Sequence, residues 1–221
     1  MSKSVYSLVL TDQVVEAIDA LAYTMGTSRS ALIDRILASH VSYTTPEMRI
    51  TGIFDSVSRL MEQHSGFIVQ AVQAGDQMMS IRSSLKYKYK PTLRYSLQLL
   101  RSSEKTEGEL KVSFRTQSAE LKARMEDFLR LWAALEDKYI VSNLPDGIRY
   151  LIEDGRFTRS FTLPDSYRDK SDEEIAAAIT AYINMFDDVL KTYFANLESG
   201  GAAEAAIRLY FEYLQKGIVQ I

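Results

Sequence analysis

Residues 4–41 read SVYSLVLTDQVVEAIDALAYTMGTSRSALIDRILASHV, and this stretch decides the fold of the N-terminal part of the chain. Near its start the apolar side chains of Tyr6, Leu8 and Leu10 lie two residues apart. A period of two is typical of a β-strand that buries one of its faces. The stretch therefore begins with a predicted strand.

Two helices are predicted after this strand. Thr11 offers a hydroxyl as the N-cap of the first helix, and Asp12 lies in its first turn, where the helix dipole favours a negative charge. Gly26 ends this helix, because glycine enters the left-handed conformation beyond a helix C-terminus without steric cost. Thr27 or Ser28 caps the second helix. The apolar residues at helical spacing are Val14, Val15, Ile18, Leu21, Ala22 and Met25, then Ala31, Leu32, Ile36 and Leu37.

A unit of one strand and two short helices buries too little surface to fold alone. Its strand also has no partner nearby in the sequence. Both difficulties disappear if two copies pair their strands into an antiparallel ribbon and interlock their helices. The sequence therefore predicts a homodimer, with a higher oligomer left open.

The unit resembles the ribbon-helix-helix family of DNA-binding proteins over residues 3–42. Its most specific part is the run Met25-Gly26-Thr27-Ser28-Arg29-Ser30-Ala31-Leu32-Ile33, with the strand end Leu8-Val9-Leu10-Thr11 at the family's distance before it. The resemblance implies an intertwined dimer whose β-ribbon enters the major groove of double-stranded DNA. The base-facing residues that it implies are Val5, Ser7 and Val9, with Lys3 as a further polar reader. The residues that it implies for phosphate contact are Thr27, Ser28, Arg29 and Ser30, at a helix start where free N–H groups form an anion site.

The base-facing positions depart from the family's usual pattern of long hydrogen-bonding side chains. Val5 and Val9 can touch a thymine methyl group, but they cannot read a donor and acceptor pattern. This predicts weak or shape-dependent specificity. The alternative is a ribbon that serves only to join two chains.

The remaining residues predict a second domain. Residues 1–43 are predicted to form the DNA-binding and dimerisation domain, and residues 46–221 a domain for oligomerisation or for binding an effector or partner. The predicted class is α+β, mostly helical, with one or two β-hairpins after the ribbon-helix-helix unit. A heptad seam predicts a long helix packed on another helix, either one of the same chain or its own copy in the dimer. The seam residues are Ile50, Phe54, Val57, Met61, His64, Ile68 and Ala71.

Residues 85–99 alternate between apolar or aromatic odd positions and polar or basic even positions. This predicts a long, half-exposed strand, which Pro91 makes an edge strand or breaks. Its basic side chains are Lys86, Lys88, Lys90 and Arg94. They either add phosphate contacts beside the ribbon or form a solvated edge that discourages aggregation.

Further along, the pattern predicts a helix opened by Gln117 or Ser118, a hairpin about Asp154-Gly155, and two closing helices. Asp187 and Asp188 are interpreted as part of a solvated helix face. No convergent polar cluster that would define a small-molecule site is identifiable in this part of the sequence.

Composition argues against several other functions. The chain of 221 residues has no cysteine, two histidines and a net charge of −3. Phosphate-loop and dinucleotide fingerprints are absent, and neither His40 nor His64 has a plausible catalytic partner. We therefore expect no enzyme, no cofactor and no metal site. No apolar run is long enough for a bilayer, so no membrane contact is expected and the cytoplasm is the expected location.

The predicted function is that of a sequence-specific, repressor-type transcriptional regulator of bacterial type. Two alternatives remain open at this point. One is another DNA-binding role, as an antitoxin or as a plasmid-partition or mobilisation accessory protein. The other is a dimeric interaction protein that does not bind DNA.

Overall fold

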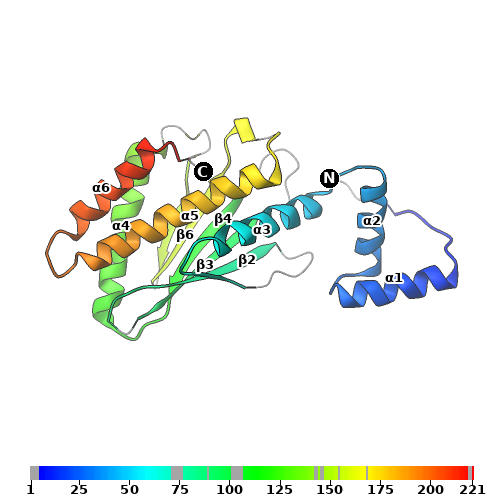
Figure 1. The fold of residues 1–221 in the computed structure, drawn as a ribbon, viewed down its shortest axis with the longest axis horizontal. Helices are drawn as coiled ribbons and strands as arrows, with labels where there is room; N and C mark the ends of the chain where they lie inside the picture. Colours follow the sequence, from blue (N-terminus) through cyan, green and yellow to red (C-terminus); the bar gives the residue numbers. More distant parts are fainter. Residues whose placement is uncertain are drawn as a thin grey trace.

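The computed structural model describes residues 5–70, 77–88, 90–100, 107–141, 144, 147–153, 155–167, 169–218 and 221. They form an α+β protein, 53% helical, with six α-helices and one antiparallel sheet (Figure 1). The prediction of a mostly helical α+β chain is confirmed. The prediction of only one or two hairpins is wrong, because the sheet has six strands in the order β1-β2-β3-β4-β6-β5.

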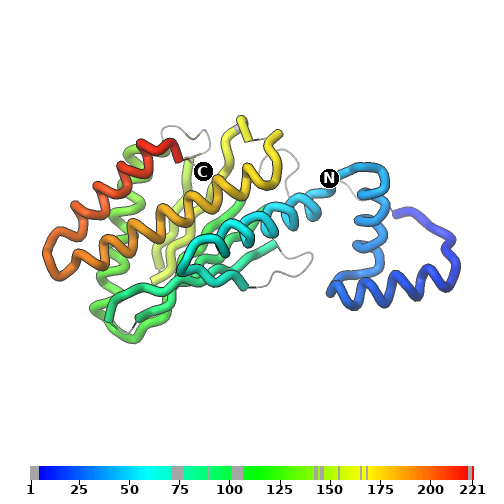
Figure 2. The backbone as a smooth tube through the Cα atoms, in the orientation of Figure 1, coloured from blue at the N-terminus to red at the C-terminus, as the bar shows by residue number. Residues whose placement is uncertain are grey.

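The N-terminal unit consists of α1 (Asp12–Thr24) and α2 (Arg29–His40), which stand to one side of the sheet and the other helices (Figures 1 and 2). Thr11 occupies the N-cap position of α1, although its side chain makes no capping hydrogen bond. Gly26 follows α1 with a φ of 61°, as the sequence predicts. The Ser28 hydroxyl caps α2 by accepting a hydrogen bond from the amide of Ala31 at 3.2 Å.

The next helix, α3 (Pro46–Glu62), carries the first half of the predicted apolar seam. Ile50, Phe54, Val57 and Met61 are buried, and the helix that α3 packs against is α5 of the same chain. The predicted continuation is wrong: α3 ends at Glu62, and the chain enters β1 (Phe67–Val69). His64 is therefore outside the seam, and Ala71 lies outside the described residues.

The sheet continues through β2 (Met78–Ser84), β3 (Thr92–Leu99) and β4 (Glu107–Phe114) to β6 (Arg156–Thr162), with β5 (Tyr150–Glu153) at its far edge. One parity of each central strand is buried and the other faces outward. This alternation is what an antiparallel sheet shows when helices cover only one of its faces. The predicted β5–β6 hairpin is confirmed about Gly155, whose φ is 71°, while Asp154 lies outside the described residues.

Residues 85–99 do not form the one long strand that the alternation predicts. The chain turns between β2 and β3, where the amide of Leu85 donates to the carbonyl of Pro91 at 3.0 Å. Proline lacks a backbone N–H for a sheet ladder, and β3 begins directly after it. The alternation of buried and exposed residues also holds before β3, with Leu85 and Pro91 buried and the lysines exposed. It belongs to a strand only in β3, where Leu93, Tyr95, Leu97 and Leu99 are buried.

Three further helices complete the covered face: α4 (Ala119–Tyr139), α5 (Asp172–Ala195) and α6 (Ala202–Gln215), with a short 3-10 turn, η2 (Asp165–Tyr167), before α5. Ser118 caps α4, as predicted, by accepting from the amide of Leu121. In Figure 1, α5 lies between α3 and α6, and it packs on both.

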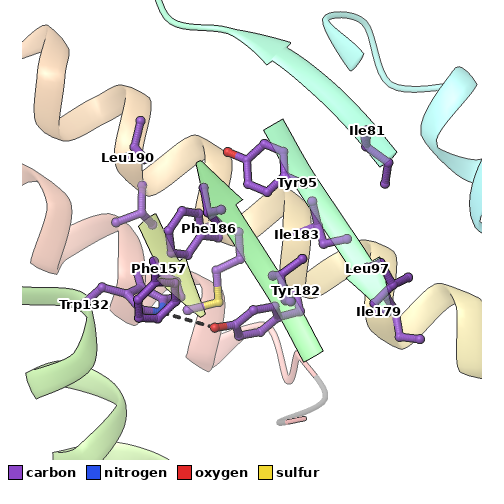
Figure 3. Packing of buried hydrophobic residues seen from close by; sticks show 14 of the residues in the cluster. Ile81, Tyr95, Leu97, Trp132, Phe157, Ile179, Tyr182, Ile183, Phe186 and Leu190 are labelled. Atoms are coloured by element: carbon purple, nitrogen blue, oxygen red, sulfur yellow. Dashed lines mark hydrogen bonds between the residues drawn. The ribbon is translucent and has the colours of Figure 1, made fainter. Parts of the chain in front are cut away.

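The core between sheet and helices is rich in aromatic rings (Figure 3). The rings of Trp132 and Phe186 have centroids 4.7 Å apart, and Phe157 from β6 stacks on Phe186 at 5.7 Å. The indole N–H of Trp132 donates to the Tyr182 hydroxyl at 3.1 Å. Aromatic pairs of this kind add to the stability that their burial alone provides.

Candidate functional site

The residues that the family resemblance places on the ribbon are exposed in the single chain. Residues 5–11 belong to no helix or strand, and Thr11 has extended backbone angles. Val5 and Val9 are fully exposed, and Ser7 between them is exposed as well. Lys3 lies outside the described residues.

Exposed apolar surface is concentrated in this unit. Twelve of the sixteen exposed large hydrophobic side chains of the described residues belong to residues 5–43. They are Val5, Tyr6, Leu8, Val9, Leu10, Val14, Leu21, Tyr23, Ile36, Leu37, Val41 and Tyr43. By contrast, only Ala22, Leu32 and Ala38 of the apolar residues in this range are buried. Exposed apolar side chains concentrated in one unit are typical of an interaction surface.

The start of α2 offers free backbone donors. The Ser28 hydroxyl satisfies the amide of Ala31, and the Ser28 carbonyl accepts from Leu32. Among the described residues no acceptor faces the amides of Arg29 and Ser30. Two free N–H groups at the positive end of a helix dipole can hold an anion.

The Arg29 side chain is already engaged within the unit. Its Nε donates to Asp19 Oδ1 at 2.6 Å, and a second guanidinium nitrogen pairs with Oδ2. The hydrogen bond from Arg29 lowers the pKa of Asp19 below its ordinary value, so the pair is charged at neutral pH. An anion at the start of α2 therefore meets the backbone amides and the Ser30 hydroxyl more readily than the Arg29 charge.

The basic residues predicted to share one strand are not arranged in that way. Lys86, Lys88 and Lys90 lie in the loop between β2 and β3, at the end of the sheet that is remote from α1 and α2 in Figure 1. Lys88 pairs with Glu120 of α4 at 3.7 Å. Arg94 alone is on a strand, exposed on the outer face of β3 and directly opposite Arg82 of β2. The single chain does not bring these side chains beside residues 5–11.

A second polar cluster, which sequence reasoning missed, lies between the helices and the sheet. Asp187 of α5 is 1% exposed and accepts hydrogen bonds from the Tyr95 hydroxyl at 2.7 Å and the Ser83 hydroxyl at 3.2 Å. Lys191 Nζ lies 2.5 Å from Asp187 Oδ2. The interpretation of Asp187 as part of a solvated face is therefore wrong, whereas Asp188 is exposed as predicted.

The sequence did contain a signal for this cluster. Asp187 follows Ile183 by four residues and precedes Leu190 by three, so it shares the buried stripe of its helix. A carboxylate on a buried stripe needs partners, because burial without hydrogen bonds is costly. Its partners come from strands about a hundred residues earlier in the chain, a separation that no local pattern reveals.

This cluster borders a groove of about 510 Å³ over α5, between the C-terminal ends of α3 and α6. We refer to it as the α5 groove. Its polar lining residues are His64, Ser65, Thr180, Asn184, Asp187, Asp188, Lys191 and Tyr213, and its apolar ones are Leu60, Phe67, Ala177, Ala181 and Ile218. A volume of this size is in the range of small-molecule sites.

Two other properties of the described residues bear on function. No group of three or more histidine and acidic side chains in this part of the chain is placed to hold a metal ion. Among the described helices, none has both the length and the apolar character required to cross a bilayer.

Comparison with protein-family models, with curated proteins and with solved structures finds no match to this chain.

Proposed function

We propose that the protein is a homodimeric, sequence-specific DNA-binding protein, a transcriptional regulator of the repressor type. The observation that carries the proposal is the concentration of exposed apolar side chains on residues 5–43. A second copy that pairs residues 5–11 into an antiparallel ribbon would cover Tyr6, Leu8 and Leu10. It would leave Val5, Ser7 and Val9 on the opposite, outward face of that ribbon.

The outward face of such a ribbon fits the major groove of duplex DNA. The valines would contact thymine methyl groups, and Ser7 would supply the polar contact. Thr27, Ser28, Arg29 and Ser30 would position the dimer on the phosphate backbone, chiefly through the free amides at the start of α2. Because Arg29 is paired with Asp19, we expect a shallow salt dependence of binding.

A second candidate, a dimeric interaction protein without DNA contact, is favoured by one observation. The two fully exposed valines carry no group that reads a base pattern. The roles of antitoxin and of partition or mobilisation accessory protein use the same DNA chemistry as a repressor and are distinguished by target, not by fold.

The first test is selection from a randomised duplex library, with light scattering to establish the oligomeric state. We expect a dimer that enriches a palindromic site. Ser7→Ala should relax selection at particular bases, and Ser30→Pro, which removes one free amide and the Ser30 hydroxyl, should weaken binding to all sequences.

Two results would contradict the proposal or redirect it. A dimer that enriches no site establishes the interaction protein instead. The other result is DNA binding that is unchanged by Ser7→Ala and Ser30→Pro but lost when Lys86, Lys88 and Lys90 are changed to Gln. It would place the DNA contact on the β2–β3 loop.

A further inference from the structure

We propose that the α5 groove binds a small organic cation, a primary ammonium or amidinium group carried on an apolar body. The inference concerns residues 60–68 and 177–218 and does not depend on DNA binding by the N-terminal unit. It follows from three features of the groove: unused hydrogen-bonding groups, an excess of negative charge and apolar walls.

The unused hydrogen-bonding groups point to a ligand. Thr180 is 4% exposed, yet its hydroxyl has no hydrogen-bond partner among the described residues. The Oδ1 atom of Asn184, one helical turn further along α5, is also buried without a partner there. Both residues line the groove. Because buried polar groups are almost always bonded, two unbonded groups on residues of one wall mark that wall as a place where a ligand could supply the partner.

The charged residues of the groove favour a positively charged ligand. Asp187 is already satisfied by Tyr95, Ser83 and Lys191. One carboxylate oxygen of Asp188 accepts a hydrogen bond from the Tyr213 hydroxyl. No described lysine or arginine forms an ion pair with Asp188. The groove thus offers an unneutralised carboxylate beside the Asn184 oxygen, which is the acceptor-rich setting that a donor cation needs.

The one lysine that lines the groove among the described residues does not make it an anion site. Lys191 Nζ is held 2.5 Å from Asp187 Oδ2 and lies 5.5 Å from the centroid of the Phe67 ring. An anion that paired with Lys191 would have to approach two carboxylates, and the like charges would repel it. A cation would instead be attracted by both carboxylates.

The apolar lining residues indicate that the cation carries an apolar body. Leu60 and Phe67 come from the α3 end and β1, Ala177 and Ala181 from α5, and Ile218 from the segment after α6. A ring or alkyl chain between these walls would place its ammonium group toward Asn184 and Asp188. Apolar walls together with polar groups that fix the ligand's orientation are typical of small-molecule sites.

The test compares three probes that share one carbon skeleton: 4-phenylbutylammonium, 4-phenylbutanol and 4-phenylbutanoate. Each is titrated calorimetrically into the full chain. We expect saturable binding of the ammonium alone, weakened about tenfold or more by Asp188→Asn, because a charged hydrogen bond is lost. Thr180→Val should weaken it by about two- to tenfold, the contribution of one neutral hydrogen bond.

Matched variants separate the site from general charge and from misfolding. Glu198→Gln removes an exposed carboxylate outside the groove and should leave ammonium binding unchanged. Thr180→Val breaks no hydrogen bond seen among the described residues and removes a buried hydroxyl without a partner, so the variant should be at least as stable to heat as the wild type. The proposal is overturned if the ammonium shows no saturation at millimolar concentration, if the three probes bind equally, or if Asp188→Asn and Glu198→Gln act alike.

Discussion

At the residue scale, the most consequential pair is Glu136 of α4 with Arg159 of β6, both 0% exposed. Arg159 Nε donates to one carboxylate oxygen at 3.0 Å, and a terminal nitrogen lies 2.9 Å from the other. The Tyr182 hydroxyl donates to Glu136 at 2.8 Å, and Arg159 also donates to the Ile221 carbonyl. The network joins α4, α5, the sheet and residue 221, and it leaves neither charge without a counter-charge.

Glu136→Gln removes one charge of this pair and leaves the Arg159 charge buried. We expect the free energy of unfolding to fall by about 3–5 kcal/mol, the usual cost of an uncompensated buried charge. Urea titration followed by circular dichroism measures it. Glu126→Gln, which breaks the exposed pair with Arg130 on the same helix, is the control and should change little. Equal effects of the two variants would show that burial does not govern the pair.

Asp19→Asn, a second single-residue change, tests whether the ion pair with Asp19 keeps Arg29 from contacting DNA. The pair exists where Asp19 is ionised. If the protein binds DNA as proposed, the carboxylate would compete with DNA phosphate for Arg29 at neutral pH. Removing it should raise DNA affinity at low salt and steepen the plot of log affinity against log salt by about 0.9 for each additional phosphate that the protein neutralises. Asp34→Asn removes the same charge from α2 without releasing Arg29 and should leave the slope unchanged. An unchanged slope in Asp19→Asn means that Arg29 does not face the DNA.

At the element scale, local signals were sufficient for some elements and not for others. α2 and α4 were predictable because their Ser caps and apolar spacing are local. The β2–β3 region was not predictable, because a loop can carry the same alternation as a strand. The turn is shown by backbone hydrogen bonds, such as those from Leu85 to Pro91 and from Lys90 to Tyr87. The α5 groove was also invisible, because its walls come from α3, β1, α5 and α6. The proposed ribbon would require a second chain, so its strand pairing stays a prediction.

The sheet leaves no space for a side chain at Gly108 of β4. A Cβ atom added there would lie 2.2 Å from the carbonyl oxygen of Gln98 on β3, and 2.7 Å from the Phe161 ring on β6. The carbonyl belongs to the ladder and cannot move without breaking the β3–β4 pairing. We expect Gly108→Ala to lower the free energy of unfolding by about 1–3 kcal/mol through overpacking, as measured by urea titration. Ser113→Ala, on the outward parity of the same strand, should cost much less. Equal costs would mean that the strands separate freely at Gly108.

At the scale of the whole molecule, one layer of helices covers one face of a sheet, and tyrosines occupy the space between the layers. Tyr95 and Tyr182 are buried. The Tyr95 hydroxyl donates a hydrogen bond to Asp187, and the Tyr182 hydroxyl donates one to Glu136. Each phenol can donate to its carboxylate only while it is protonated. The interior is therefore held together by groups whose bonding depends on a proton, and its stability must fall at high pH.

Burial raises the pKa of Tyr95 and of Tyr182 well above the ordinary value, and the charge of Asp187 raises that of Tyr95 further. A pKa that is higher in the folded chain than in the unfolded one stabilises the fold fully below the unfolded value. This contribution is lost as the pH rises beyond about 10, the value for a solvated tyrosine. We expect the urea midpoint to fall steeply above that pH, with ultraviolet absorbance of the phenolate reporting tyrosine ionisation together with unfolding. Tyr95→Phe should be less stable at neutral pH, because its hydrogen bond to Asp187 is lost, and should lose less of its remaining stability in alkali. If the wild type and Tyr95→Phe lose stability in parallel, the Tyr95 proton does not couple the sheet to α5.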